Sequence, residues 1–195
     1  MHMKRENLGD VAQVTAGHPI RSAVRDVPGG DVAVVQIKNM KAETGVDWPA
    51  VARMVLEGRR EPDLLKAGDI LFSARGNRNV AVCLDQSPPR AVCSPHFFLI
   101  RVKKGQPVLP DFIAWQINLP HSQRYLAQSA TGSYITSIRR QVLEQLPLLL
   151  PSLERQRLLV RLAHAAQREK QLLEQLIENR QRELDLVAEQ LLAYV

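Results

Sequence analysis

The pattern of apolar and polar positions divides the chain into two parts with different periods. Up to residue 151, short apolar runs with a period near two, rich in Val, Ile and Phe, are separated by Gly and Pro. Such runs predict strands bounded by turns. Strands are predicted over residues 8–17, 32–37, 69–74, 79–84 and 91–102, with a last, brief one over 146–151.

Between residues 110 and 146 the period changes to a helical one. Pro110 and Asp111 suit the start of a helix over 110–119, and a second short helix is predicted over 121–130, after Pro120. A polar turn at 131–134 and a short helix over 139–146 follow. Strands and helices therefore alternate irregularly, which predicts an α+β domain over residues 1–151.

After Pro151 the chain contains no further Gly or Pro. Ser152 is a good N-cap, and Glu154 complements the helix dipole in the first turn. An uninterrupted helix of about 42 residues would be roughly 60 Å long at about 1.5 Å per residue. We therefore assign 152–195 as one long helix and a second domain.

A repeat of four and three residues runs along this predicted helix. It is the 3.5-residue repeat of a coiled-coil seam, sustained over five heptads and interrupted by Lys170 and Arg180. The alternative is an amphipathic helix folded against the first domain, but the stripe runs further than a domain of about 150 residues could cover. A partner helix from another chain is implied. The seam consists of Leu159, Ala163, Ala166, Lys170, Leu173, Ile177, Arg180, Leu184, Val187, Leu191 and Tyr194.

Charge is unevenly distributed between the two parts. The whole chain has 26 Lys and Arg against 20 Asp and Glu, a net charge of +6. From Ser152 onward seven basic residues balance seven acidic ones, so residues 1–151 carry the entire excess. A basic globular part beside a neutral helix favours a polyanionic partner for the former.

The cellular environment is suggested by what the sequence lacks. No apolar run approaches the roughly 20 residues needed to span a bilayer, and no apolar segment follows the charged start MHMKREN. Cys83 and Cys93 lie in apolar surroundings without metal-ligand spacing, which favours free thiols over a disulfide. We expect a cytoplasmic protein that does not contact membranes.

No catalytic or metal-ligating constellation is recognisable. The segment SPPR at 87–90 resembles the turn that holds the target amine in amino-methyltransferases, but Arg90 stands where that chemistry needs an aromatic ring. The histidines lie far apart, and no serine has the setting of a nucleophile. We predict a protein without catalytic residues, metal or cofactor.

Three polar segments are the candidates for function. The stretch GDILFSARGNRN, 68–79, begins as a buried strand and ends as a basic turn, and Arg and Asn can each place two hydrogen bonds on a base edge. The end of the 32–37 strand and the segment ATGSYITSIRR, 130–140, offer further cations and hydroxyls for phosphates. The predicted DNA contacts are Arg75, Asn77, Arg78, Asn79, Lys38, Asn39, Lys41, Ser133, Tyr134, Arg139 and Arg140.

Read in order, these stretches resemble a DNA specificity (S) subunit of a type I restriction–modification system. LGDVAQVTAGHPIRS resembles the opening strand and turn of that family, and GDILFSARGNRNVAV its Gly-Asp-hydrophobic-Ser-x-Arg-Gly strand and loop. The segment from Leu109 to Leu162 resembles the family's helix, its Ala-x-Gly-Ser turn and the Pro-x-Leu-x-x-Gln entry to a long helix. A usual S subunit has two recognition domains and two long helices, whereas this chain has one of each. It resembles a half-length subunit.

The resemblance implies a target recognition domain over 1–151 and a dimerisation and spacer helix over 152–195. Such subunits do no chemistry. They read one half of a bipartite site in double-stranded DNA per recognition domain and dock methyltransferase (M) subunits, which use S-adenosylmethionine, and restriction (R) subunits. This chain would pair with itself or with a second half-subunit through Leu159, Ala163, Ala166, Leu173, Ile177, Arg180, Leu184, Val187 and Leu191. Two alternatives stay open: a stand-alone dimeric DNA-binding regulator, and a DNA-modifying enzyme with an unrecognised motif.

Overall fold

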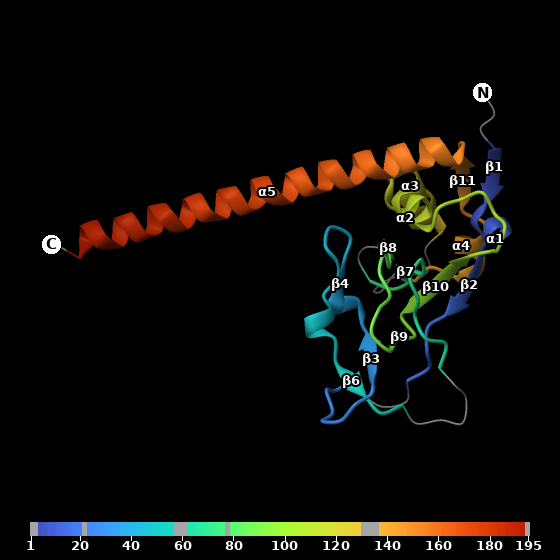
Figure 1. The fold of residues 1–195 in the computed structure, drawn as a ribbon, viewed down its shortest axis with the longest axis horizontal. Coiled ribbons are helices and arrows are strands. Elements are labelled where there is room, and N and C mark those ends of the chain that lie inside the picture. The colour runs from blue at the N-terminus through green and yellow to red at the C-terminus, as the bar shows by residue number, and fades with distance from the viewer. Residues whose placement is uncertain (1–3, 21–22, 57–61, 77–78, 130–136, 194–195) are drawn as a thin grey trace. The chain divides into compact units, whose positions relative to one another are not determined.

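A computed structural model describes residues 4–20, 23–56, 62–76, 79–129 and 137–193. The chain divides into two compact units, residues 1–157 and 158–195. Its class is α+β, with small strand-rich sheets followed by one long helix, as the sequence predicts (Figure 1).

The first unit contains short elements in a mixed order. They are β1 (Lys4–Asn7), α1 (Leu8–Val11), β2 (Ala12–Ala16), β3 (Val32–Val35), η1 (Ile37–Asn39), β4 (Met40–Lys41), β5 (Gly45–Val46), η2 (Trp48–Ala50), β6 (Arg53–Met54), β7 (Ile70–Ser73), β8 (Ala81–Cys83), β9 (Ala91–Cys93), β10 (Phe97–Val102), α2 (Pro110–Asn118), α3 (Pro120–Ser129), α4 (Arg140–Glu144) and β11 (Pro147–Leu150). The helix α5 (Leu153–Leu192) begins in this unit and continues through the second.

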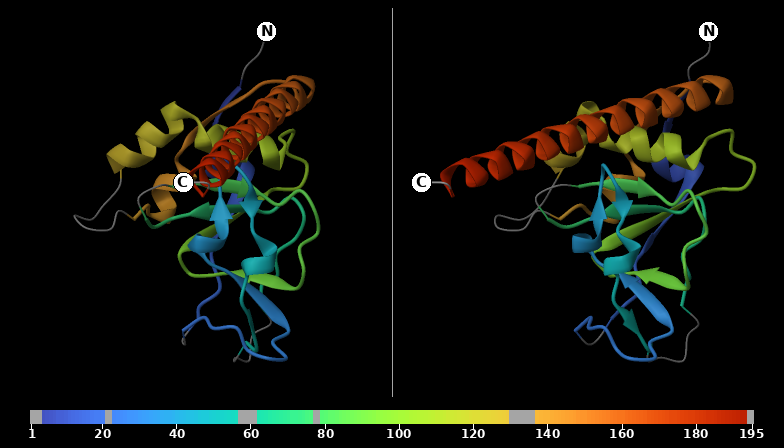
Figure 2. Two further views of the ribbon diagram at one scale, coloured as in Figure 1. Left: turned by 90° about the vertical axis from the view of Figure 1, so that its left-hand side faces the viewer. Right: turned by 60° about the vertical axis from the view of Figure 1, so that its left-hand side comes forward.

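Two sheets share the core of the first unit. An antiparallel sheet has the strand order β2-β10-β7-β8, and a mixed sheet has the order β6-β3-β9, in which β3 and β9 run parallel. The two remaining pairs are β1-β11 and β4-β5. In Figures 1 and 2, α2 and α3 lie at one end of this unit and β6 at the other.

The apolar run Val32–Val35 is buried on both faces of its sheet. Ala33 and Val35 join a cluster with Leu71, Phe97 and Leu99 of the antiparallel sheet. Val32 and Val34 join a separate cluster on the opposite face. A strand covered on both sides carries a continuous rather than an alternating apolar pattern.

Two predicted strands differ from the structure. The 8–17 segment begins with one helical turn, α1, because Asn7 and Asp10 form a capping box, and only Ala12–Ala16 is a strand. The 91–102 segment is two strands, β9 and β10, which belong to different sheets. A turn closed by the Phe97 N–H donating to the Ser94 carbonyl separates them. Periodicity alone did not reveal this change of sheet, since both strands are apolar.

Gly17 lies where two segments approach too closely for a side chain. A Cβ atom at this position would lie 2.0 Å from the Ser94 carbonyl oxygen. Gly17 N–H donates to the Phe97 carbonyl at 3.0 Å, and His18 N–H donates to the Cys93 carbonyl at 2.8 Å. The glycine that ends the first predicted strand therefore lets the backbone pass across the β9–β10 turn.

The Gly-Asp pair before β7 has a structural role. Gly68 has φ = 82°, in the left-handed region that glycine adopts without a Cβ penalty. Asp69 is 3% exposed and lies across the sheet from Arg101, because Ile70 pairs with Ile100. The Arg101 guanidinium donates to both Asp69 oxygens, at 2.7 and 2.9 Å, and also to the Asp63 carboxylate and the Leu64 carbonyl. The hydrogen bonds that Arg101 donates to Asp69, and also to Asp63, raise the pKa of Arg101 above its usual value despite the opposing effect of burial.

Two buried glutamines hold the segment that leads into α5. Gln116 in α2 donates to the Leu149 carbonyl at 2.6 Å and accepts from the Leu149 N–H at 2.9 Å. Gln156, fully buried, accepts from the Leu109 N–H and donates to the carbonyls of Pro107 and Pro151. The Gln of the Pro-x-Leu-x-x-Gln motif thus satisfies backbone groups of the first unit.

The second unit, taken by itself, is a single helix without a core. Ion pairs between Lys170 and Glu174 and between Arg180 and Glu183 lie within the helix. Its apolar side chains are largely exposed in the single chain, including Leu173, Ile177, Leu184, Val187 and Leu191, each more than half exposed. Tyr194, the last predicted seam residue, lies outside the described residues.

Two other expectations concern cysteines and membranes. Cys83 and Cys93 are free, and burial raises the pKa of both thiols to about 12. Among the described helices, none combines the length and the apolar character that crossing a membrane requires.

We predict that Arg101→Leu destabilises the first unit by about 3 kcal/mol, because it leaves the buried Asp69 charge without its partner. The change is measured as the free energy of unfolding in urea. Asp63→Asn is the matched control: its carboxylate is 57% exposed, so its loss should cost less than about 1 kcal/mol. Equal stability of Arg101→Leu and the parent protein would contradict a stabilising role for this pair.

Candidate nucleic-acid interface

The loop between β7 and β8 lies between two of the other predicted contact segments. Its first residues pair with the segment before α4: Ile138 N–H donates to the Ala74 carbonyl at 2.9 Å, and Arg75 and Ser137 form an antiparallel bridge. On the other side, β5 packs beside β8, with Gly45 next to Val82. Segments that are about 35 and 60 residues apart in sequence are therefore neighbours in the fold.

Ser73 and Val80 close the base of this loop. Ser73 N–H donates to the Val80 carbonyl at 2.9 Å, and Val80 N–H donates to the Ser73 hydroxyl at 2.7 Å. The Asn79 side chain donates to the Ser73 carbonyl at 2.9 Å. Asn79, a predicted base contact, uses its amide N–H within the loop, so we assign it a role in loop shape.

Two amide side chains from the helices support the same loop from outside. Asn118, at the end of α2, accepts from the Ala81 N–H at 3.0 Å and donates to the Ala81 carbonyl at 2.7 Å. Gln123 in α3 donates to the carbonyls of Asn79 and Ile117, both at 2.8 Å. Ala81 lies 37 residues from Asn118 in sequence, and Asn79 lies 44 residues from Gln123. Sequence reasoning missed both residues, because an amide that binds backbone leaves no periodic signal.

Arg75 and Arg139 present exposed cations on the two paired segments. Arg75 follows the buried strand β7, and Arg139 is the N-cap residue of α4. Within the described part of the chain neither makes an ion pair. Arg140 is exposed as well, but its guanidinium pairs with Glu144 at 2.8 Å, so its charge is partly neutralised.

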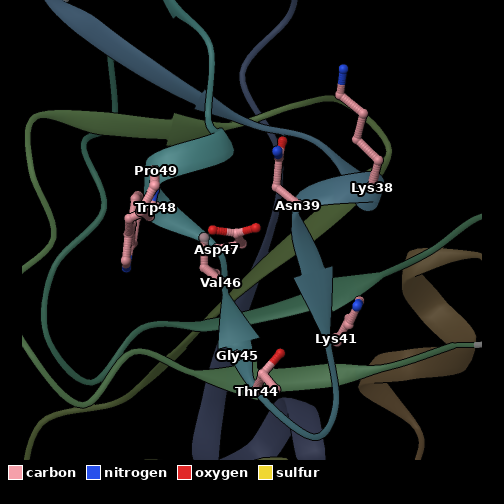
Figure 3. A pocket seen from close by; sticks show the side chains of 9 residues that line it. All are labelled: Lys38, Asn39, Lys41, Thr44, Gly45, Val46, Asp47, Trp48 and Pro49. Carbon is pink, nitrogen blue, oxygen red and sulfur yellow. The ribbon is translucent and has the colours of Figure 1, made fainter. Parts of the chain in front are cut away.

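Lys38 and Lys41 are exposed, whereas Asn39 between them is buried. Figure 3 shows both lysine side chains extending away from the backbone of η1 and β4. Asn39 is 4% exposed, accepts from the Gln36 N–H at 3.0 Å and donates to the Ala50 carbonyl at 2.9 Å. Its amide is committed to the fold, so we no longer count Asn39 among the candidate base contacts.

Asn77, Arg78, Ser133 and Tyr134 lie outside the described residues, and their predicted role stays a prediction. Among the residues that are described, no three His, Cys, Asp or Glu side chains gather into a group able to hold a metal ion. The placed candidates that remain exposed are all cations: Lys38, Lys41, Arg75, Arg139 and Arg140. Cations of this kind suit phosphates, and arginine also suits guanine edges.

No protein-family model matches the chain, and no curated protein matches it significantly. Solved structures do match. The HsdS subunit of Thermoanaerobacter tengcongensis superposes with a TM-score of 0.64 at 18% identity, covering 95% of this chain and 47% of that one. The chain has the fold of a type I restriction–modification S subunit.

Two further structures agree. The S subunit of the type I restriction–modification system of M. genitalium matches with a TM-score of 0.51 and 11% identity, over 76% of this chain and 34% of that one. A chain from a study of complex assembly and conformational transition in the type I R-M system matches with a TM-score of 0.53 and 17% identity, over 86% and 41%. This chain spans less than half the length of each of these three chains.

We predict that Asn118→Ala loosens the loop between β7 and β8. It leaves the N–H and the carbonyl of Ala81 without their partners, which costs about 1–3 kcal/mol for each buried group that stays unsatisfied. Hydrogen exchange should become faster at residues 79–81, and Gln123→Ala should act in the same direction at 79. Replacement of the exposed Gln86 by Ala is the control, and it should leave hydrogen exchange at residues 79–81 unchanged. Parent-like protection in Asn118→Ala would remove this residue from the support of the loop.

Proposed function

We propose that this protein is a half-length DNA specificity subunit of a type I restriction–modification complex. Residues 1–151 would read one half of a bipartite site in double-stranded DNA, and residues 152–195 would pair with a second such helix. The observation that carries the proposal is the S-subunit fold, in which the segments that carry the exposed Arg75 and Arg139 pair with each other although they lie about 60 residues apart in sequence. The chain itself would do no chemistry, and S-adenosylmethionine would bind to a partner methyltransferase subunit.

The charge distribution supports DNA as the partner of the first unit. All of the net charge of +6 resides in residues 1–151, and Arg75, Arg139, Lys38 and Lys41 remain without an ion pair among the described residues. Because the stem of the 74–80 loop is held by hydrogen bonds, exposed side chains on it would meet DNA with little loss of backbone entropy. We keep Asn77, Arg78, Ser133 and Tyr134 in the proposed interface on sequence grounds.

The seam of α5 supports dimerisation. A helix cannot cover its own apolar stripe, and Leu173, Ile177, Leu184, Val187 and Leu191 repeat at the coiled-coil spacing. Burying each such side chain is worth about 1.5–3 kcal/mol. We propose that a second copy of this chain, or a second half-subunit, covers the seam.

The apolar surface of α5 is wider than a two-helix seam needs. Leu158, Leu162, Leu172, Leu176 and Leu186 each directly precede a seam residue, so they form a second stripe about 100° round the helix. Each of them is more than half exposed in the single chain. A pair of helices would leave this second stripe open, which supports docking of further helices, and we propose methyltransferase subunits as their source.

We predict that the combined change Leu173→Asp, Ile177→Asp and Leu184→Asp abolishes dimerisation, because it would place three carboxylates in an apolar seam. Sedimentation analysis of the full chain measures the outcome. The control is Gln175→Asp with Arg182→Asp, on the opposite face of the same helix, for which the dimer should persist. A seam variant that sediments as the parent dimer would show that the interface lies elsewhere.

We predict that Arg75→Ala reduces discrimination between the target sequence and a scrambled duplex by about 1–3 kcal/mol if Arg75 contacts a base. The target is first obtained by selecting sites from a random duplex library with the parent protein. A homodimer should select two inverted halves separated by a gap, since two-fold symmetry repeats the half-site. Binding is then measured at two salt concentrations.

Arg90→Ala is the control for this experiment. Arg90 is also exposed, but it pairs with Asp31 beside β3 and β9, away from the 74–80 loop. It should alter neither the discrimination nor the salt dependence. A uniform loss over all sequences in Arg75→Ala would identify a phosphate contact, and unchanged binding would exclude Arg75 from the interface. A library selection that enriches no sequence would overturn the proposed function itself.

A further inference from the structure

The β4–β5 hairpin and the η1 and η2 turns enclose a pocket of about 300 Å³. This is at the lower end of the volumes of small-molecule sites, roughly 300–1,000 Å³. Figure 3 shows the residues that line it: Lys38, Asn39, Lys41, Thr44, Gly45, Val46, Asp47, Trp48 and Pro49.

The walls of this pocket are held by the buried Asn39. Its side chain joins Gln36 before η1 to Ala50 in η2, and its carbonyl accepts from the Asp47 N–H at 2.8 Å. Trp48 packs against the core cluster, is only partly buried, and also lines the pocket. The hydrogen bonds of Asn39 and the packing of Trp48 hold the pocket walls within the fold.

Charged groups that the fold does not use surround the pocket. In the described part of the chain, the side chains of Lys38, Lys41 and Asp47 take part in no ion pair or hydrogen bond. Asp47 precedes η2 without capping it through its side chain. Lys38, Lys41, Thr44, Asp47 and Trp48 are thus all among the residues that line one pocket.

We propose that this pocket binds a single nucleotide. Its base would stack on Trp48, as bases do on aromatic side chains, and its phosphate would lie between the ammonium groups of Lys38 and Lys41. The Asp47 carboxylate would accept a hydrogen bond from an exocyclic amine, as acidic side chains do from cytosine. Thymine has no such amine, so the pocket would prefer cytosine to thymine.

The proposal rests in part on the proposed function, because Lys38 and Lys41 also belong to the DNA-reading surface. The nucleotide bound in this pocket could come from two sources: a nucleotide extruded from the base stack of bound DNA, or a free nucleotide from solution. A nucleotide extruded from DNA would give the first unit a way of recognising a base that is separate from groove contacts.

The experiment uses the full chain with Trp115→Phe, so that Trp48 is the only tryptophan. Trp115 lies in α2 with its ring 5.5 Å from that of Phe112, which makes phenylalanine a conservative replacement. Tryptophan fluorescence is titrated with dCMP, dTMP and inorganic phosphate. We expect saturable quenching by dCMP, at least about tenfold weaker affinity for dTMP, and none of this quenching with phosphate alone.

Variants test each wall of the pocket. Lys38→Ala with Lys41→Ala changes only exposed side chains and should weaken dCMP binding by about tenfold or more without altering the urea unfolding curve. Asp47→Ala should remove the preference for dCMP over dTMP. Lys104→Ala, which changes an exposed lysine outside the pocket, should leave the affinity for dCMP unchanged.

A duplex with one unpaired cytosine and its fully paired counterpart distinguish the two sources. Tighter binding of the former, lost in the double lysine variant, identifies DNA as the source, whereas dCMP binding with equal affinity for both duplexes identifies a free nucleotide. No saturable response to dCMP together with equal affinity for the two duplexes overturns the pocket. That result would not change which sequences the parent protein selects from the duplex library. Failure of nucleotide binding in the pocket can therefore be distinguished from failure of DNA recognition.

Discussion

The cross-strand ion pair of Asp69 and Arg101 is the constraint on which the arrangement of the first unit depends. It joins the start of β7 to the end of β10, the two strands at the centre of the antiparallel sheet. A carboxylate buried to this degree is stable only with a partner. A shift of register between the two strands would separate the Asp69 carboxylate from Arg101 and leave a buried charge unpaired. The register, in turn, decides where β7 ends and where the loop that carries Arg75 begins.

Hydrogen bonds to backbone groups then give that loop its shape. Ser73, Asn79, Asn118 and Gln123 all form hydrogen bonds with main-chain atoms at its base. Among the described residues, these four side chains are therefore supports, while the candidates that remain exposed are cations. On our proposal, this division leaves the charged side chains to contact phosphates and base edges.

The long helix follows a different physical rule. The first unit encloses a core of its own, whereas α5 beyond residue 157 has apolar side chains and nothing in its own unit to cover them. Its two apolar stripes, the seam and the row of leucines beside it, are typical of a helix whose apolar side chains are covered by other helices. This chain spans less than half the length of each of the three matching structures, and on our proposal a helix from another chain covers its apolar stripes.

The sequence by itself determined the class of the fold, the long helix and most of the central elements. Those features follow from local periodicity, from Gly and Pro, and from the capping residue Ser152, which act over a few residues. Only the tertiary structure decided that residues 91–102 divide between two sheets, and that Asp69 is buried in an ion pair with Arg101. It also decided that Asn39 faces inward while Lys38 and Lys41 face solvent, since a short polar turn gives no period from which orientation follows. Contacts between residues 30 or more positions apart, such as Asn118 with Ala81, depend on how the elements pack, and packing is a property of the whole chain.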